Sequence, residues 1–228
     1  MTDEQSRDIE REVVLVGCGK MGSALASGLI ESGRLEADLL VCNDVNPAIA
    51  NALAEKLGAT VGEPRSDEGR VWLIAVKPRD IEAAIRDRRD AIDASDLVIS
   101  VAAGTTTATL REALGDGPTV VRAMPNTPAL VGEGVTGVFA PEDDGLATAR
   151  RIFAAVGEVV ELSSESDFDA LTAISGSGPA YVFTALEALA DGGVLMGLSR
   201  SVARRLSVAT VRGAATLAHE QADTHTAE

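Results

Sequence analysis

The chain of 228 residues has little of several residue types that carry chemistry. Its two histidines, His219 and His225, stand near the C-terminal end, so we expect neither a histidine-ligated zinc site nor a serine–histidine–aspartate triad in the body of the chain. The two cysteines, Cys18 and Cys42, form no CxxC motif and no disulfide framework. Such cysteine usage is typical of a protein from a reducing cytoplasm, and a cytoplasmic location is therefore expected.

Lysine and long apolar runs are also scarce. The three lysines are Lys20, Lys56 and Lys77, so nothing in the last two-thirds of the sequence can act as a Schiff base or a lysine acid. The longest uncharged stretch, residues 170–186, contains serine, threonine, glycine and proline, and we predict no membrane span. The polar, acidic start does not resemble a secretory signal. The chemistry must therefore rest on a cofactor, backbone groups, hydroxyls or carboxylates.

Acidic residues outnumber basic ones by 35 to 20, which gives a formal net charge of −15. An acidic surface repels phosphate, so nucleic acid is a poor candidate partner. A dense carboxylate surface repels itself at low ionic strength and is screened at high salt. We therefore predict a halophilic protein that loses stability when salt is removed, the alternative being an ordinary acidic surface.

Apolar residues make up 46% of the chain and recur as short runs that alternate with amphipathic segments. Unbroken apolar runs are typical of buried parallel strands, so the pattern predicts an α/β fold with a mostly parallel sheet covered on both faces. Beyond residue 168 only helical periodicity appears, and we place a domain boundary near residue 162. The predicted strands are residues 13–17, 39–43, 71–76, 97–101, 120–124, 135–140 and 159–162; the predicted helices include 21–31, 47–57, 80–92 and 143–156.

A glycine-rich motif joins the first predicted strand to the first predicted helix. It reads Gly17-Cys18-Gly19-Lys20-Met21-Gly22. In this context, the spacing predicts a dinucleotide-binding turn: Gly17 permits the bend, Gly19 admits a pyrophosphate, and Gly22 allows close packing of helix on strand. The alternative is a glycine-rich turn without a ligand.

The end of the second predicted strand carries Asn43 and Asp44. Asp44 stands where an acidic side chain would bind the ribose hydroxyls of the adenosine, and a carboxylate there would repel a 2′-phosphate. This favours NADH, or use of both cofactors. The alternative is that Asp44 or Asn46 only caps the helix that Pro47 begins.

Further loops follow other predicted strands, and in open α/β sheets ligands bind at the carboxyl ends of strands. These segments are residues 75–78, 100–104 and 122–128, and each could also be an ordinary loop. A later turn, Ser175-Gly176-Ser177-Gly178-Pro179, opens a helix whose free amides could bind an anion or could simply be capped.

Together the segments GCGKMG, AVKP, SVAAG, RAMPNTP, ISGSGPAY and DGGVLMGLSR resemble the pyrroline-5-carboxylate reductase family, from about residue 12 to the end. The resemblance implies a Rossmann-type dinucleotide-binding domain, residues 1–162, followed by a helical dimerisation and substrate domain, residues 163–228. It implies reduction of the small imino acid L-1-pyrroline-5-carboxylate to L-proline, in proline biosynthesis, by NADPH or NADH. It also implies a homodimer or a higher homo-oligomer, and no metal.

The resemblance assigns roles by matching position. The cofactor would be held by Gly17, Gly19, Lys20, Met21, Gly22, Asn43, Asp44, Ala75, Val76, Lys77, Pro78, Val101, Ala102, Ala103, Pro125 and Asn126. The substrate would be held by Glu165, Gly176, Gly178 and Pro179. In the family, the hydroxyl nearest the imine nitrogen belongs to a later loop, so Ser177 and Thr127 are the remaining local hydroxyls expected to serve this nitrogen as catalytic groups.

Two departures from the family pattern define the alternatives. The family continues to an SPGGTT-type loop that holds the substrate carboxylate, whereas this sequence stops at Ala227-Glu228, so we expect an incomplete helical domain. Residues 60–70 lack the asparagine that the family has near the adenine. The alternatives are a catalytically silent dinucleotide-binding or dimerising protein, and a hydroxyacid dehydrogenase. The absence of lysine after Lys77 argues against the latter.

Overall fold

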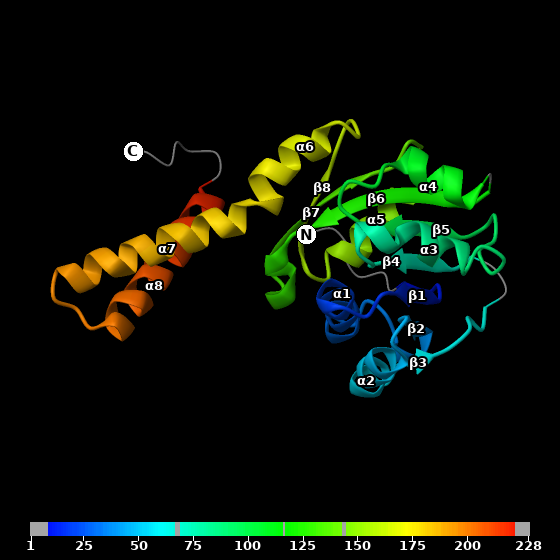
Figure 1. The fold of residues 1–228 in the computed structure, drawn as a ribbon, viewed down its shortest axis with the longest axis horizontal. Coiled ribbons are helices and arrows are strands. Elements are labelled where there is room, and N and C mark those ends of the chain that lie inside the picture. The colour runs from blue at the N-terminus through cyan, green and yellow to red at the C-terminus, as the bar shows by residue number, and fades with distance from the viewer. Residues whose placement is uncertain (1–8, 67–68, 116, 143–144, 222–228) are drawn as a thin grey trace. The chain divides into compact units, whose positions relative to one another are not determined.

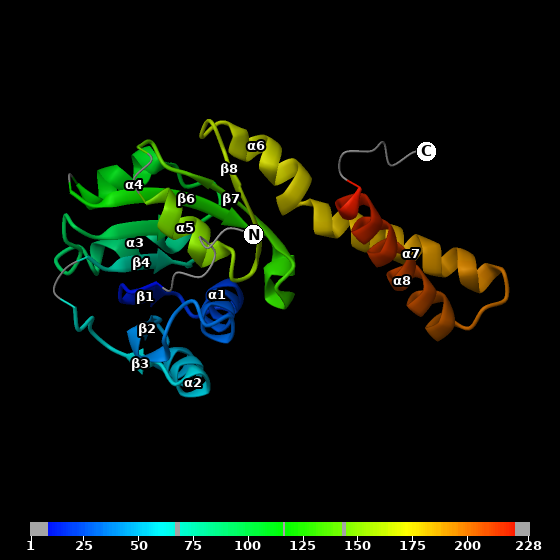
Figure 2. The ribbon, with the colours of Figure 1, turned by 180° about the vertical axis from the view of Figure 1, so that it is seen from behind.

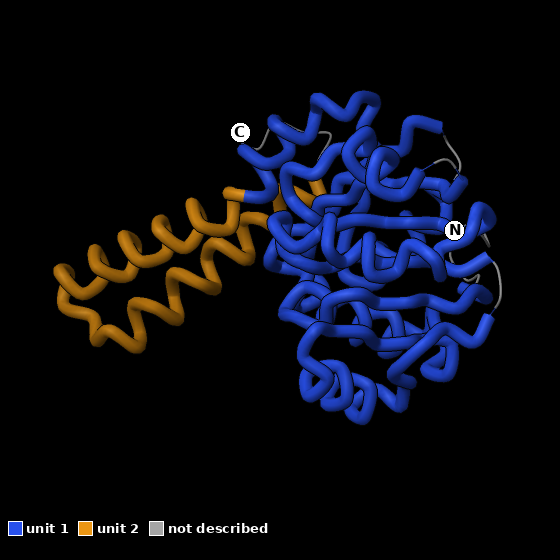
Figure 3. Tube along the Cα trace, turned by 45° about the vertical axis from the view of Figure 1, so that its right-hand side comes forward, with its two compact units in different colours: residues 1–176 blue, residues 177–228 orange. Residues whose placement is uncertain are grey.

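A computed structural model describes residues 9–66, 69–115, 117–142 and 145–221. The chain forms two compact units, residues 1–176 and 177–228 (Figure 3). The short helix α6 (Asp167–Leu171) and a π-helical turn (Thr172–Gly176) belong to the first unit, where Phe168 is buried. The domain boundary near residue 162 stays a prediction.

The first unit is built on one sheet with the strand order β3-β2-β1-β4-β5-β6-β7-β8 (Figure 1). All neighbouring strands are parallel except β6 and β7, which are antiparallel. The predicted mostly parallel sheet is thus confirmed, whereas β3 and the antiparallel pairing of β7 with β6 were not predicted. The strands are β1 (Val13–Val16), β2 (Leu40–Asn43), β3 (Thr60–Val61), β4 (Val71–Ile74), β5 (Leu97–Ser100), β6 (Thr119–Pro125), β7 (Gly134–Phe139) and β8 (Gly157–Glu161).

Helices cover both faces of this sheet, which can be followed from behind in Figure 2. One core cluster joins the sheet to α1 (Lys20–Glu31), α2 (Pro47–Leu57) and α5 (Leu146–Phe153). The other joins it to α3 (Ile81–Arg86) and α4 (Thr107–Leu114). Successive side chains of a strand point to opposite faces, so Val13 and Leu15 enter the first cluster and Val14 and Val16 the second. Burial on both faces explains why β1 reads as an unbroken apolar run.

Two helices are shorter than predicted. The helix predicted over residues 80–92 is preceded by a 3₁₀ turn (Pro78–Asp80) and ends at Arg86, after which the chain continues in turns. The helix predicted over residues 143–156 begins at Leu146, directly after Gly145 with its positive φ of 88°. Residues 143 and 144 lie outside the described part of the chain. Further 3₁₀ turns span Ala37–Leu39 and Thr127–Val131.

The second unit is a helical hairpin of α7 (Gly178–Leu195) and α8 (Arg200–Glu220). The two helices approach closely, because a Cβ placed on Gly193 would lie 3.0 Å from the Cβ of Ala203. Ser199 caps α8 by accepting a hydrogen bond from the amide of Val202 at 3.4 Å. None of the helices that the structure describes combines the length and the apolar character needed to cross a membrane.

Candidate functional site

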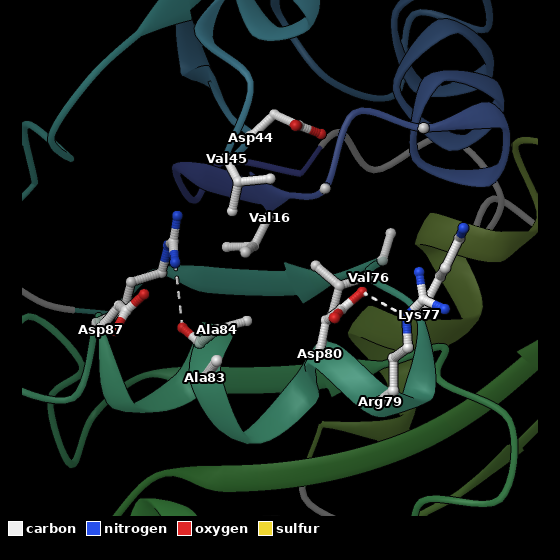
Figure 4. A pocket seen from close by; sticks show the side chains of 14 residues that line it. Val16, Asp44, Val45, Val76, Lys77, Arg79, Asp80, Ala83, Ala84 and Asp87 are labelled. Carbon is white, nitrogen blue, oxygen red and sulfur yellow. Dashed lines mark hydrogen bonds and ion pairs between the residues drawn. The ribbon is translucent and has the colours of Figure 1, made fainter.

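A cavity of about 340 Å³ lies at the carboxyl ends of β1, β2 and β4 (Figure 4). Asp44 and Val45 form one side, and Val76 with Ala83 and Ala84 of α3 forms the other. This is the edge of a parallel sheet at which ligands bind. The predicted cofactor residues that line the cavity together are Gly17, Gly19, Asp44, Ala75, Val76 and Lys77.

The glycine-rich turn has the shape that a dinucleotide pyrophosphate requires. A Cβ on Gly22 would lie 2.0 Å from the carbonyl oxygen of Gly17, so the helix packs directly on the turn. A Cβ on Gly19 would meet no protein atom within 4 Å, so the space beside Gly19 is open. Helix α1 begins at Lys20, and no side chain caps it. Its first amides, including those of Lys20 and Met21, are thus available to an anion, and the residues present fit a dinucleotide.

Asp44 ties the end of β2 to the glycine-rich turn. Its Oδ2 accepts a hydrogen bond from the amide of Cys18 at 2.8 Å, and its Oδ1 accepts one from the amide of Asn46 at 2.9 Å. Asn46, rather than Asp44, caps α2 by accepting from the amide of Ala48 at 3.1 Å. The side-chain hydrogen bond with Cys42, together with burial, raises the pKa of the Cys18 thiol, which therefore stays neutral. Asn46 is thus the cap of α2, whereas the role of Asp44 toward a cofactor stays a prediction.

Other predicted cofactor residues surround this edge of the sheet. Asn43 ends β2 and donates a hydrogen bond from Nδ2 to the carbonyl of Gly62 at 3.1 Å. Pro78 begins the 3₁₀ turn that leads into α3. Val101, Ala102 and Ala103 directly follow β5, and Ala102 is buried.

The side chain of Asn126, directly after β6, makes hydrogen bonds that connect segments of the first unit. Its Nδ2 donates to the carbonyl of Ser175 at 3.2 Å, and its Oδ1 accepts from the amide of Val135 at 2.9 Å. Pro125 is the last residue of β6, and Thr127 begins the next 3₁₀ turn. The side chain of Asn126 therefore joins β6, β7 and the residues before the hairpin.

The residues predicted to bind substrate fall in both units. Gly176 ends the π-helical turn of the first unit, where a Cβ would lie 2.9 Å from Cε of Met124. Ser177, Gly178 and Pro179 stand at the start of α7 in the second unit, and the carbonyl of Ser177 accepts from the amide of Ala180 at 3.0 Å. Their roles toward a substrate stay predictions.

Glu165 holds three parts of the first unit together. Its Oε1 accepts from the amide of Thr107 at 2.7 Å and from Nη1 of Arg122 at 3.1 Å, and its Oε2 accepts from the Thr107 hydroxyl at 3.0 Å. The Arg122 guanidinium also lies 4.0 Å from the ring centre of Phe168. Burial works to raise the pKa of Glu165, but these hydrogen bonds outweigh it and hold the pKa below its ordinary value.

Sequence reasoning missed several of these residues. Thr107 was not predicted, and Arg122 was noted only within the segment RAMPNTP, although a lone charge inside the apolar β6 is a signal that Arg122 has a partner. Arg79, Asp80 and Arg88 were not predicted to line the cavity. Arg79 and Asp80 lie in the 3₁₀ turn that follows AVK, and Arg88 follows α3; their closeness in sequence to the AVKP segment is the signal that could have found them.

The chain matches two family models. Residues 165–228 match "Pyrroline-5-carboxylate reductase dimerisation", and residues 12–104 match "NADP oxidoreductase coenzyme F420-dependent". The chain is thus similar to a nucleotide-dependent oxidoreductase in its first part and to a dimerisation domain in its last part.

Relatives and solved structures give the same family. A pyrroline-5-carboxylate reductase of Methanosarcina acetivorans is 39% identical over 92% of this chain and 80% of its own length, and one of Arabidopsis thaliana is 39% identical over 90% and 76%. The reductase structure from Coxiella burnetii has a TM-score of 0.87 at 33% identity, covering 96% of this chain and 83% of its own. That from Plasmodium falciparum, with NADP bound, has a TM-score of 0.80 at 29% identity, covering 96% and 82%. The chain belongs to the pyrroline-5-carboxylate reductase family.

Proposed function

We propose that this chain reduces L-1-pyrroline-5-carboxylate to L-proline with a reduced nicotinamide dinucleotide, a step of proline biosynthesis. One observation carries the proposal: the uncapped start of α1 and the open space at Gly19 border a cavity at the carboxyl edge of the sheet, in a member of the reductase family. Neither a histidine nor a lysine acid is needed, because an imine protonated in solution is already electrophilic.

The chain's own residues bind and orient the reactants. The first amides of α1 hold the pyrophosphate, and Asp44 fixes the turn through the amide of Cys18. The loops that begin at Ala75 and Val101, at the ends of β4 and β5, would line the ribose and the nicotinamide. When bound, the reduced nicotinamide supplies the hydride.

The substrate and catalytic residues are proposed from the family motifs. Gly176, Gly178 and Pro179 contribute to the substrate pocket, and the hydroxyls of Thr127 and Ser177 are the candidates to serve the imine nitrogen. Glu165 is proposed to act near the substrate, although its oxygens already accept three hydrogen bonds from protein groups.

We further propose that the chain is a homodimer joined through its helical unit, in a salt-rich cytoplasm. The apolar side chains that α7 and α8 leave exposed support the dimer. The net charge of −15 and the free, buried state of both cysteines agree with the proposed environment.

The test is the loss of reduced-nicotinamide absorbance on addition of pyrroline-5-carboxylate, in concentrated KCl, with NADH and NADPH in separate assays. We expect oxidation that depends on the substrate and yields proline. The matched control is Gly19→Ala, which is expected to abolish turnover because its methyl group enters the open space beside the helix start. Cofactor binding without turnover would instead favour a silent dinucleotide-binding protein.

A further inference from the structure

Arg88 is the residue through which the cofactor cavity is expected to distinguish NADPH from NADH. Arg88 follows α3, and it lines the same cavity as Asp44 and Val45 at the end of β2. A second, adjoining cavity of about 270 Å³ is also lined by Val45 and Arg88, together with Asn43 and Glu63. Arg88 therefore belongs to the wall that the two cavities share at the β2 end.

The guanidinium of Arg88 is available to an anion. Within the described part of the chain it makes no ion pair, and its Nη1 donates to the carbonyl of Ala84 at 3.2 Å. The other arginine of the main cavity, Arg79, has a carboxylate neighbour, since its Nε lies 3.7 Å from Oδ2 of Asp80. A guanidinium has five donors in a planar fork that suits phosphate oxygens.

The Asp44 carboxylate, which was expected from the sequence to repel a 2′-phosphate and so to favour NADH, accepts hydrogen bonds from the protein backbone instead. Both of its oxygens accept hydrogen bonds from backbone amides, one from Cys18 and one from Asn46. These hydrogen bonds offset part of the carboxylate's charge and fix its orientation toward the glycine-rich turn. In a dinucleotide-binding fold, the end of the second strand faces the adenosine ribose, and a nearby arginine there accommodates a 2′-phosphate. The sequence places no arginine between residues 41 and 51, so the charge has to come from another element.

From these contacts we infer that Arg88 binds the 2′-phosphate of NADPH and gives the cavity its preference for the phosphorylated cofactor. The inference rests on the proposed nicotinamide-dependent function and adds a specificity-determining residue to it. Among the described residues that line the smaller cavity, Arg88 is the one with a cationic side chain, and Asp87 and Glu63 are the two with carboxylates. Removing Arg88 thus leaves two carboxylates facing the phosphate.

The test is the binding of adenosine 2′,5′-bisphosphate and of 5′-AMP to the full chain, measured by calorimetry at one fixed KCl concentration. These probes differ by the 2′-phosphate, and their binding requires no turnover. We expect the wild type to prefer the bisphosphate, and Arg88→Ala to weaken its binding by about tenfold or more while leaving 5′-AMP binding unchanged. Arg88→Lys keeps the charge but lacks the planar fork of donors, so its affinity for the bisphosphate is expected to lie between those of the wild type and Arg88→Ala.

The matched control is Arg86→Ala, which removes one positive charge from α3 at an exposed position outside both cavities. It should change neither affinity. An equal loss of both probes in Arg88→Ala would contradict the inference, because it would place Arg88 against the adenine. A wild type without preference for the bisphosphate would also overturn it. A preserved preference in a chain without reductase activity would refute the proposed reaction and leave the role of Arg88 standing.

Discussion

The two units of the chain differ in how much apolar surface they bury. The first unit buries Trp72, Phe153 and Phe168 and packs both faces of its sheet. In the second unit, the buried residues within the described part are Ala190, Ala203 and Ser207, whereas Leu195 and Met196 are 87% and 86% exposed. A region that buries so little cannot offset the entropy of ordering its chain. The dinucleotide unit thus carries its own core, whereas the hairpin leaves large apolar side chains exposed.

The largest effect is expected from an added methyl group in the glycine-rich turn. Gly22→Ala would place a Cβ 2.0 Å from the carbonyl oxygen of Gly17, and this overpacking should cost about 3 kcal/mol of the free energy of unfolding. The matched variant Gly19→Ala adds the same group where no protein atom lies within 4 Å. It should keep the thermal midpoint and lose nucleotide binding. Equal destabilisation by both variants would show that the first unit is not packed as described.

A smaller loss of folding stability is expected from Glu165→Gln, which removes the negative charge to which Arg122 and Thr107 donate hydrogen bonds. Charge-assisted hydrogen bonds at a half-buried position suggest a loss of about 2 kcal/mol near neutral pH, measured by denaturant unfolding. The control is Glu55→Gln at an exposed position of α2, away from this contact.

The pH dependence of the same variant gives a second readout. Because the folded pKa of Glu165 lies below its ordinary value of 4.5, its stabilisation is complete above pH 4.5 and is lost as the pH falls through the folded pKa. The wild type should therefore lose more stability than Glu165→Gln on acidification below pH 4.5. Parallel acid profiles of the two proteins would contradict this account of Glu165.

The hairpin should respond in assembly more than in folding. Leu206 is 53% exposed on α8, so Leu206→Asp should change the fold of one chain little. It should instead shift the molar mass in solution, measured by light scattering, from a dimer toward the 23.5 kDa of one chain. Glu187→Gln, at an exposed polar position of α7, is the control and should leave the mass unchanged. A wild type that is already monomeric would end the proposed role of the hairpin.

The smallest and most diffuse effect is expected from salt. Removing KCl should lower the thermal midpoint, since the net charge of −15 is then less well screened. A midpoint that does not depend on KCl concentration would favour an ordinary acidic protein.

The sequence predicted those features of the molecule that depend on residues close to one another in the chain. The glycine-rich turn and the apolar strands were found because their spacing and burial leave direct traces in the residue order. The antiparallel pairing of β7 was not, because strand direction depends on packing between distant segments. The hydrogen bonds of Glu165 join residues 58 and 43 positions away, and no local pattern reveals such partners. The place of Arg88 in the cavity likewise depends on how α3 packs on β1 and β4.

The central claim is that this chain transfers hydride to a cyclic imino acid. The most direct measurement supplies pyrroline-5-carboxylate with NADPH deuterated at both C4 positions and analyses the product by mass spectrometry. The account predicts L-proline carrying one deuterium at the former imine carbon. Oxidation of the cofactor without deuterated proline, or nucleotide binding without either product, would contradict it.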